Sequence, residues 1–144
     1  MSLTDQLGGY YFDEISVGMS AVFGKTVTDA DIVAFTGASG DTNPIHLNEE
    51  YAAESMFRKR IAHGVLTASF ISTVIGTKLP GPGCIYVSQN LRFKAPVFVG
   101  DTVMANVEVT GLIPDKRFVE MKTVCTVGEK IVLDGEAIVM APKR

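Results

Sequence analysis

A carboxylate and an imidazole lie five positions apart in the run from Ser39 to His46, whose letters are SGDTNPIH. Asp41 and His46 supply these groups, and His46 is one of only two histidines in the chain. Together they can accept and return protons near neutral pH, which general acid–base catalysis requires. Taken singly, Asp41 also suits a turn and His46 also suits packing. Their occurrence on one loop keeps proton transfer open as the chemistry of this segment.

The backbone between these two groups is stiff. Pro44 has a locked φ, and it pushes Asn43, the residue before it, toward an extended conformation. A stiff connection holds two reacting groups at a constant separation. The loop is therefore restricted where proton transfer would need it to be.

A second candidate feature is the His63-Gly64 step, which opens a long apolar segment. If that segment is a helix, the N–H of Gly64 points out of its positive end and can receive negative charge that develops on an oxygen. Tight backbone packing is an equally good reason for a glycine at this position. Two histidines without a nearby cysteine or a His-x-x-x-His spacing do not favour a zinc site, so we expect no metal.

Other common catalytic patterns are missing from the sequence. Ser69 and Ser72 lie in the apolar segment outside any Gly-x-Ser-x-Gly elbow, so a serine nucleophile is poorly supported. Neither Gly-x-Gly-x-x-Gly nor a P-loop occurs. This argues against nicotinamide, flavin or ATP bound in those ways.

The composition predicts one globular domain over residues 1–144, because 47% hydrophobic residues suffice for a core. The net charge is −3, whereas proteins that bind nucleic acids or anionic membranes usually carry an excess of positive charge. The longest apolar stretch, Val65 to Ile75, is too short to span a bilayer, and the first residues do not form a signal segment. Cys84 and Cys125, in strand-like segments, suit reduced thiols, so we expect a soluble cytoplasmic protein.

The elements that must position the candidate groups begin with a strand. Ser20 to Val27 is rich in β-branched and aromatic residues, which favours a strand. Thr28 is typical of a helix N-cap, with Asp31 three residues later, and Gly37 is expected to end that helix. The loop that carries Asp41 follows.

The segment between the two candidate sites is expected to begin with a short helix. Asn48 can cap this helix, with Tyr51, Ala52 and Met56 on its buried side. The basic run Phe57 to Arg60 is interpreted as a solvated connection, with a phosphate contact as the alternative.

The remaining chain predicts one helix and then a sheet. Val65 to Lys78 is apolar or small on nearly every face, and a helix that is hydrophobic all round is a buried helix. Alternating patterns then predict strands, and a sheet is the only layer large enough to cover that helix. The expected class is α+β, with an antiparallel sheet wrapped around a central buried helix. The strands are expected over Ile85 to Phe93, Thr102 to Thr110, Phe118 to Val127 and Lys130 to Met140.

The run Phe35 to His46, FTGASGDTNPIH, resembles the hydratase motif of the MaoC-like (R)-specific enoyl-CoA hydratases. His63-Gly64, Leu79-Pro80-Gly81 and the run Phe93 to Asp101 are similar to the same family. The likeness extends from Thr28 to Val109 and, more loosely, to the C-terminus. The first motif is specific, whereas the later ones mainly report the fold.

This resemblance implies a hot-dog fold and a homodimer whose sheets join edge to edge. It implies the reversible addition of water to trans-2-enoyl-CoA to give (R)-3-hydroxyacyl-CoA, a lyase activity of fatty acid metabolism or polyhydroxyalkanoate precursor supply. No cofactor is expected, because coenzyme A is part of the substrate. Asp41 and His46 match the family's catalytic pair and Gly64 its oxyanion donor, whereas Asn43 matches a residue that braces the loop and Ser72 a serine near the substrate.

The sequence leaves the division of labour between Asp41 and His46 open, because either group can take or give a proton. The direction of flux and the acyl chain length are open as well. Residues expected to wall the acyl pocket are Tyr51, Met56, Leu66 and Phe70. Unranked candidates for contacts to the coenzyme A phosphates are Arg58, Lys59, Arg60, Arg92 and Lys94.

Two alternatives to a hydratase remain. Acyl-CoA thioesterases of this fold usually carry an acidic residue on the central helix, as do acyl-carrier-protein dehydratases, and Val65 to Lys78 contains neither Asp nor Glu. A non-catalytic acyl-thioester binding protein would be expected to have lost Asp41 or His46, and both are present.

Overall fold

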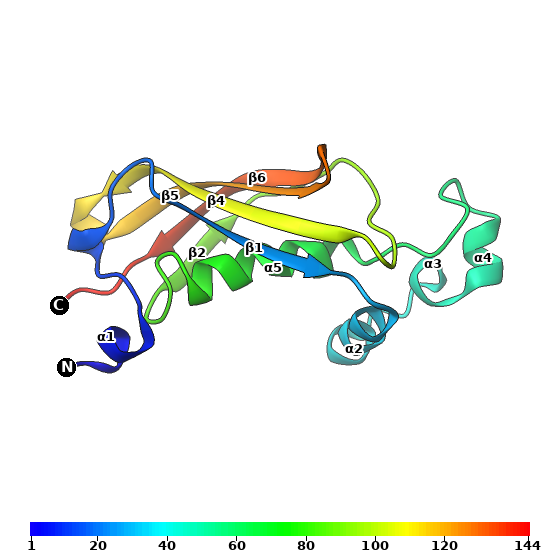
Figure 1. The fold of residues 1–144 in the computed structure, drawn as a ribbon, viewed down its shortest axis with the longest axis horizontal. Coiled ribbons are helices and arrows are strands. Elements are labelled where there is room, and N and C mark those ends of the chain that lie inside the picture. The colour runs from blue at the N-terminus through cyan, green and yellow to red at the C-terminus, as the bar shows by residue number, and fades with distance from the viewer.

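The computed structural model describes residues 1–144, and its antiparallel sheet runs along one long helix, α5 (Figure 1). The helices are α1 (Leu3–Leu7), α2 (Asp29–Ser39), α3 (Pro44–Leu47), α4 (Glu49–Ala53) and α5 (Gly64–Thr77), with short 3₁₀ helices η1 (Phe12–Glu14) and η2 (Pro114–Lys116). The strands are β1 (Ser20–Thr26), β2 (Ile85–Gln89), β3 (Arg92–Phe93), β4 (Thr102–Ile113), β5 (Phe118–Val127) and β6 (Lys130–Met140).

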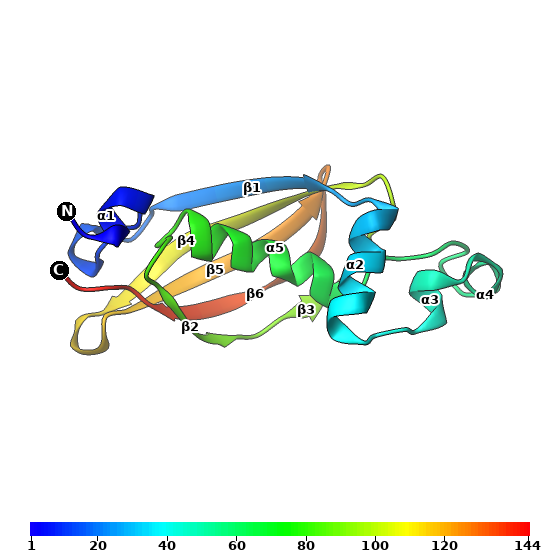
Figure 2. The same ribbon diagram turned by 90° about the horizontal axis from the view of Figure 1, so that it is seen from below.

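The sheet packs on α5 through one face. Its strands are ordered β1-β4-β5-β6-β2, and β3 pairs with β6. In β4, fully buried residues alternate with exposed ones, because successive side chains of a strand point to opposite faces. The expected α+β class and hot-dog arrangement, a sheet wrapped around a central helix, are confirmed (Figure 2). The buried residues of β4 are Val103, Ala105, Val107 and Val109.

The two ends of the molecule differ. Helices α2, α3 and α4 lie at the end where α5 begins, and both chain termini lie at the opposite end (Figures 1 and 2). The residues from the motif segments therefore gather around the N-terminal end of α5. At 14 residues, α5 is also the longest helix, and no helix has the length and hydropathy needed to cross a membrane.

Several boundaries differ from the sequence predictions: β4 continues past Thr110 to Ile113, and His46, expected on a loop, lies in α3. Helix α2 continues past Gly37 to Ser39 and ends at Gly40, whose φ of 78° is left-handed. The strand expected over Ile85 to Phe93 is two strands, β2 and β3. At Asn90 the side-chain oxygen, instead of the backbone carbonyl, accepts the Glu136 N–H at 3.1 Å, which interrupts the ladder.

The predicted burial of two helices is partly wrong. In α4, Ala52 is buried, but Tyr51 is 54% exposed, and Met56, beyond the end of the helix, is 86% exposed. The reason is that α4 packs on α3 at the tip of the molecule and not on the sheet. In α5, the sheet covers only one side, so Val65 is 60% exposed and Ser72 is exposed as well.

Candidate active site

Helix α2 delivers Asp41 to the site. Its first turn is a capping box, in which the Thr28 hydroxyl accepts from the Asp31 N–H at 3.1 Å and an Asp31 carboxylate oxygen accepts from the Thr28 N–H at 2.9 Å. Lys25 donates to the same oxygen at 2.7 Å, and Lys25 and Thr28 together hold the pKa of Asp31 below its usual value. Because Gly40 ends the helix, Asp41 is the first residue beyond it.

Short-range hydrogen bonds fix the loop that follows. The Asp41 N–H donates to the Ser39 hydroxyl at 3.1 Å, and Oδ1 of Asp41 accepts from the Asn43 N–H at 3.2 Å. Oδ1 of Asn43 accepts from the Ile45 N–H at 3.2 Å and thereby caps α3, which begins with Pro44. Asn43 is thus placed where it braces the loop, while Asp41 presents its carboxylate to solvent.

His46 is held in one tautomer. It lies in α3, is 7% exposed, and has its Nδ1 2.8 Å from the carbonyl oxygen of Ile61. Since a carbonyl oxygen can only accept, Nδ1 carries the proton and Nε2 of the neutral ring is an acceptor. Burial lowers the pKa of His46 and His63 lowers it further, whereas the Ile61 carbonyl and Asp41 oppose this change. The ring is therefore neutral at pH 7, with Nε2 able to take up a proton.

Arg60 ties α3 to the start of α2. Its Nε donates to the carbonyl of His46 at 2.7 Å, and its guanidinium pairs with Asp29 at 2.6 Å and Glu49 at 3.7 Å. Only 14% of the Arg60 side chain is exposed. Arg60 therefore holds the site together and is not a free cation for a substrate phosphate.

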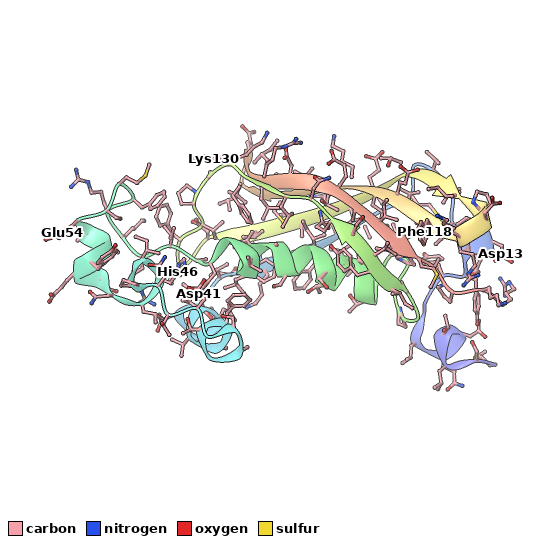
Figure 3. All side chains as sticks on the ribbon, turned by 180° about the vertical axis from the view of Figure 1, so that it is seen from behind. Asp13, Asp41, His46, Glu54, Phe118 and Lys130 are labelled. Atoms are coloured by element: carbon pink, nitrogen blue, oxygen red, sulfur yellow. The ribbon has the colours of Figure 1, made fainter.

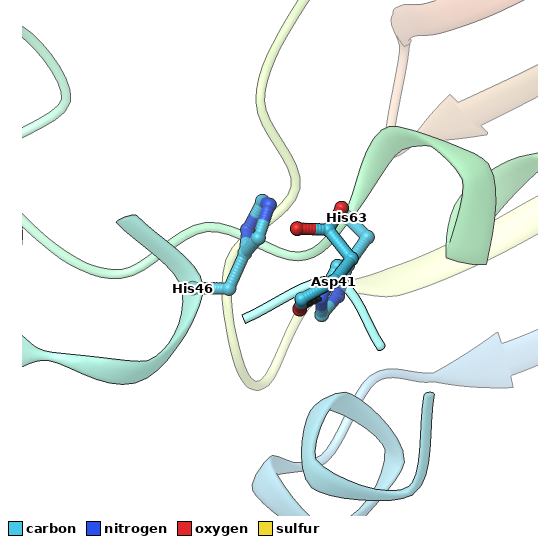
Figure 4. A group of neighbouring side chains, drawn as sticks. All are labelled: Asp41, His46 and His63. Atoms are coloured by element: carbon cyan, nitrogen blue, oxygen red, sulfur yellow. Dashed lines mark hydrogen bonds between the residues drawn. The ribbon is translucent and has the colours of Figure 1, made fainter. Parts of the chain in front are cut away.

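Asp41 and His46, the two residues that the sequence singled out, lie together at the end of the molecule that carries α2 and α3 (Figure 3). A carboxylate oxygen of Asp41 and one ring nitrogen each of His46 and His63 all lie within 4.8 Å of one another (Figure 4). A water that makes two hydrogen bonds of about 2.8 Å at a tetrahedral angle spans about 4.6 Å between its partners. The separation of the Asp41 carboxylate and the His46 ring, at most 4.8 Å, is within the reach of one such bridging water.

His63 is the site residue that the sequence did not predict, because its spacing to other residues suggested no role beyond metal binding. It is 2% exposed, its Nε2 lies 3.1 Å from the carbonyl oxygen of Asp41, and its ring stacks on His46. Its sequence signal was slight: it is the other histidine of the chain and directly precedes Gly64.

The stacking of the two histidines does not favour a metal site. Their ring centroids are 3.9 Å apart and their planes are inclined by 28°. Zinc requires imidazole lone pairs, which lie in the ring planes, to converge on one ion at about 2.0–2.1 Å. The lone pairs of stacked rings run side by side, and the Ile61 carbonyl already engages Nδ1 of His46.

Gly64 begins α5, so its N–H has no acceptor within the helix and lies at the positive end of the helix dipole. A Cβ at Gly64 would lie 2.7 Å from a ring carbon of Phe93, so only glycine allows this ring to pack here. Gly64 and Phe93 also line a mainly apolar cavity of about 430 Å³. This volume falls in the usual range of small-ligand pockets.

Other residues that the sequence places near the substrate do not line this cavity. Ser72 is exposed on α5, eight residues beyond Gly64, and neither Ser72 nor Tyr51 nor Met56 lines the cavity. Leu66 and Phe70 belong to the core beneath the sheet. The cavity walls come from the segment before α5, from α5 itself, from β3 and the residues after it, and from β6. They include Phe57, Ile61, Thr67, Ala95, Val97, Val132 and Leu133.

The five candidate cations for the coenzyme A phosphates differ in their ion-pair partners. Arg92 and Lys94 both pair with Asp134, at 3.1 and 3.0 Å, and Arg60 is engaged as described above. Arg58 and Lys59 make no ion pair, and Nζ of Lys59 lies 4.3 Å from the ring centroid of Phe98. Arg58 and Lys59 are therefore the two candidates without an ion-pair partner.

Residues 14–133 match the protein-family model of the MaoC like domain. The chain is 57% identical to the (R)-specific enoyl-CoA hydratase of Rhodospirillum rubrum over 140 aligned residues. The alignment covers 97% of each protein. The solved structure of the R-hydratase PhaJ1 from Pseudomonas aeruginosa is similar with a TM-score of 0.89 at 42% identity, over 94% of this chain and 88% of that one. The (R)-hydratase from A. caviae involved in PHA biosynthesis gives a TM-score of 0.86 at 43% identity, over 89% and 98%. By this measure the chain belongs to the MaoC-like dehydratase family.

Proposed function

We propose that the chain is an (R)-specific enoyl-CoA hydratase, a hydro-lyase that adds water reversibly to trans-2-enoyl-CoA to give (R)-3-hydroxyacyl-CoA. One observation carries the proposal: a carboxylate oxygen of Asp41 lies within 4.8 Å of a ring nitrogen of His46, and the residue after the stacked His63 is Gly64 at the start of α5. The relatives described above, which carry this activity in their names, support it.

The geometry accounts for both halves of the addition. A water held between Asp41 and His46 attacks Cβ of the enoyl group, and the pair takes up the proton that the water loses. The electrons of the double bond move to the thioester carbonyl, where the Gly64 N–H stabilises the enolate oxygen. The pair then returns one proton to Cα, so the thioester gains one water in total and the two residues end as they began. The reverse sequence removes water.

Two kinds of group lower the activation barrier of hydration. A positioned general acid or base contributes roughly 10²–10⁴ in rate. An oxyanion donor contributes roughly 10²–10³. The neutral His46, with Nε2 free to accept, is suited to take the first proton, because its Nδ1 proton is already engaged by Ile61.

The apolar cavity beside Gly64 is assigned to the acyl part of the thioester. Its walls are mainly hydrophobic, and it begins at the residue that would bind the thioester oxygen. A chain that extends from Cβ into this space would be removed from water, which stabilises binding by about 0.8 kcal/mol for each buried methylene.

The proposal includes a homodimer. The outer side of α5 leaves Val65 60% exposed, and the free edge strand β2 carries Ile85, Tyr86 and Val87 at 55%, 39% and 47% exposure. A second copy pairing along β2 would cover this strand and continue the sheet. Light scattering should give twice the 15.5 kDa chain mass, and Ile85→Lys should shift the protein toward the monomer. A monomeric wild-type protein would contradict this assembly.

The proposal also covers the number of domains, the cellular location and the need for a cofactor. Residues 1–144 are treated as one hydratase domain, because β1 and β6, from the two ends of the chain, share one sheet. Cys84 and Cys125 are free, and burial raises the pKa of both thiols, that of Cys125 to about 12, which suits unreactive thiols in the cytoplasm. No cofactor takes part, because coenzyme A arrives with the substrate.

The test is an assay with crotonyl-CoA. Loss of the absorbance of the conjugated enoyl thioester and formation of only the (R)-3-hydroxybutyryl product are expected. A thiol reagent in a parallel assay should detect no free coenzyme A, because hydration leaves the thioester intact. Release of coenzyme A, or no consumption of a chain-length series of enoyl-CoA substrates, would contradict the proposal.

A further inference from the structure

We propose that His63 is a positioning residue of the hydration site, which joins the Asp41 loop, the His46 ring and the Gly64 N–H into one unit. This inference rests on the proposed hydratase function. It is carried by three contacts of a single buried residue, two of its side chain and one of its backbone.

The first contact fixes the Asp41 loop. Nε2 of His63 lies 3.1 Å from the carbonyl oxygen of Asp41, and the hydroxyl of Thr36 lies 3.2 Å from the same nitrogen. A carbonyl oxygen can only accept, so Nε2 carries the proton and donates it to Asp41. The main chain of the residue that supplies the carboxylate is thereby attached to His63.

The second contact fixes His46. The rings of His63 and His46 stack with their centroids 3.9 Å apart. The centroid of the Phe35 ring lies 4.9 Å from that of His63, and the planes of these two rings are inclined by 54°. Nδ1 of His46 is already bound to Ile61. The His46 ring is therefore restrained both at one nitrogen and on one of its faces.

The third contact is covalent. The Gly64 N–H belongs to the peptide unit that joins His63 to Gly64, and His63 is the residue directly before α5. Any shift of the His63 backbone would move this N–H. One residue thus sets the positions of the two proton-transfer groups and of the oxyanion donor relative to one another.

His63 is also unfavourable for stability in one respect, as expected of a residue kept for function. Its Nδ1 is buried and has no hydrogen-bond partner. A buried polar atom without a partner is destabilising, and an apolar side chain of similar size would avoid that cost. The imidazole is therefore explained by what its other nitrogen and its ring hold in place.

Two variants separate the donor from the packing. His63→Phe keeps an aromatic ring against His46 but has no N–H for the Asp41 carbonyl. His63→Gln loses the ring, but its amide can donate in place of Nε2. We expect His63→Phe to lower kcat for crotonyl-CoA by about 10²-fold through misplacement of the reacting groups, with KM little changed. We expect His63→Gln to lose less, because its amide still donates to the Asp41 carbonyl, although the missing ring leaves one face of His46 unrestrained.

Two results would contradict the proposed role of His63. Wild-type kcat in a folded His63→Phe protein, or equal losses in the Phe and Gln variants, would overturn it. Should His63→Phe fail to fold, as shown by circular dichroism, His63→Met supplies an apolar side chain without a donor for the same comparison. An inactive wild-type enzyme would refute the proposed function instead, so the two failures are distinguishable.

Discussion

Nδ1 of His46 donates to the carbonyl oxygen of Ile61 over 2.8 Å, and this one bond determines which nitrogen of the ring can do chemistry. Nε2 is left as the acceptor, inside a site where burial holds the ring neutral. The other titratable or charged groups around His46 are Asp41, His63 and, at its backbone carbonyl, Arg60. The behaviour of the site with pH follows from this arrangement.

The rate of hydration should fall in acid with an apparent pKa below 6.5, the ordinary value for histidine, because burial lowers the pKa of His46. The reason is that protonation removes the acceptor on Nε2. A profile of kcat/KM for crotonyl-CoA against pH measures this value. An acidic limb centred clearly above pH 6.5 would show that the titrating group is not a buried neutral His46.

Folding stability should change in the same direction. The folded pKa of His46 lies below its unfolded value of 6.5, so the unfolded chain binds more protons in acid. The contribution of the neutral ring is fully present above pH 6.5 and is lost as the pH falls through the folded pKa. Urea unfolding at several pH values should show this slope, and it should be smaller in His46→Gln.

Gly64→Ala should impair the enzyme for a steric reason. Its Cβ would lie 2.7 Å from the Phe93 ring and would displace it, although the backbone N–H is retained. Gly64→Pro meets the same ring and also removes the N–H, which alone should lower kcat by roughly 10²–10³.

Combining each change with Phe93→Ala separates the two effects. Gly64→Ala with Phe93→Ala should regain the kcat of Phe93→Ala alone, because the clash is relieved. Gly64→Pro with Phe93→Ala should remain slow while circular dichroism shows an intact fold. Equal kcat values for the two double variants would end the oxyanion assignment.

Ala95→Leu should shorten the acyl chain that the enzyme accepts. Ala95 lines the cavity beside Gly64, and a larger side chain would take the space of the distal methylenes. Each methylene excluded from such a pocket is worth roughly 10-fold or more in kcat/KM. Crotonyl-CoA should react nearly as before while longer enoyl-CoA substrates become poor. Ala34→Leu, on an exposed position of α2, is the matched control. An equal effect on all chain lengths would place the acyl group elsewhere.

Local patterns predicted much of this fold, and the reason is visible in particular residues. The capping box of Thr28 and Asp31 involves residues three positions apart, and the burial of β4 follows its own alternation. The end of α2 was wrong because Gly37 and Gly40 are both plausible stops, and only the backbone shows that Gly40 adopts the left-handed conformation. The break at Asn90 depends on a bond to Glu136, far along the chain.

The candidate site was also predicted only in part, where local spacing determines it. Asp41 and His46 lie five residues apart in one short segment, so their spacing predicted that they would meet. His63 joins them only because the start of α5 packs beside α3, a long-range relationship that no local pattern contains. Tyr51 and Met56 were expected to be buried, but whether a short helix meets the core depends on where the chain carries it.

In the proposed mechanism, Asp41 and His46 act as one unit on a single water. The most direct measurement is a double-mutant cycle in crotonyl-CoA hydration with Asp41→Asn, His46→Gln and the two combined, and with Asp115→Asn in η2 as control. Each single change should lower kcat/KM by roughly 10²–10⁴, and the combination should be little worse than the more damaging single change. Near wild-type kcat/KM in either folded single variant, or losses that multiply in the double variant, would contradict the claim.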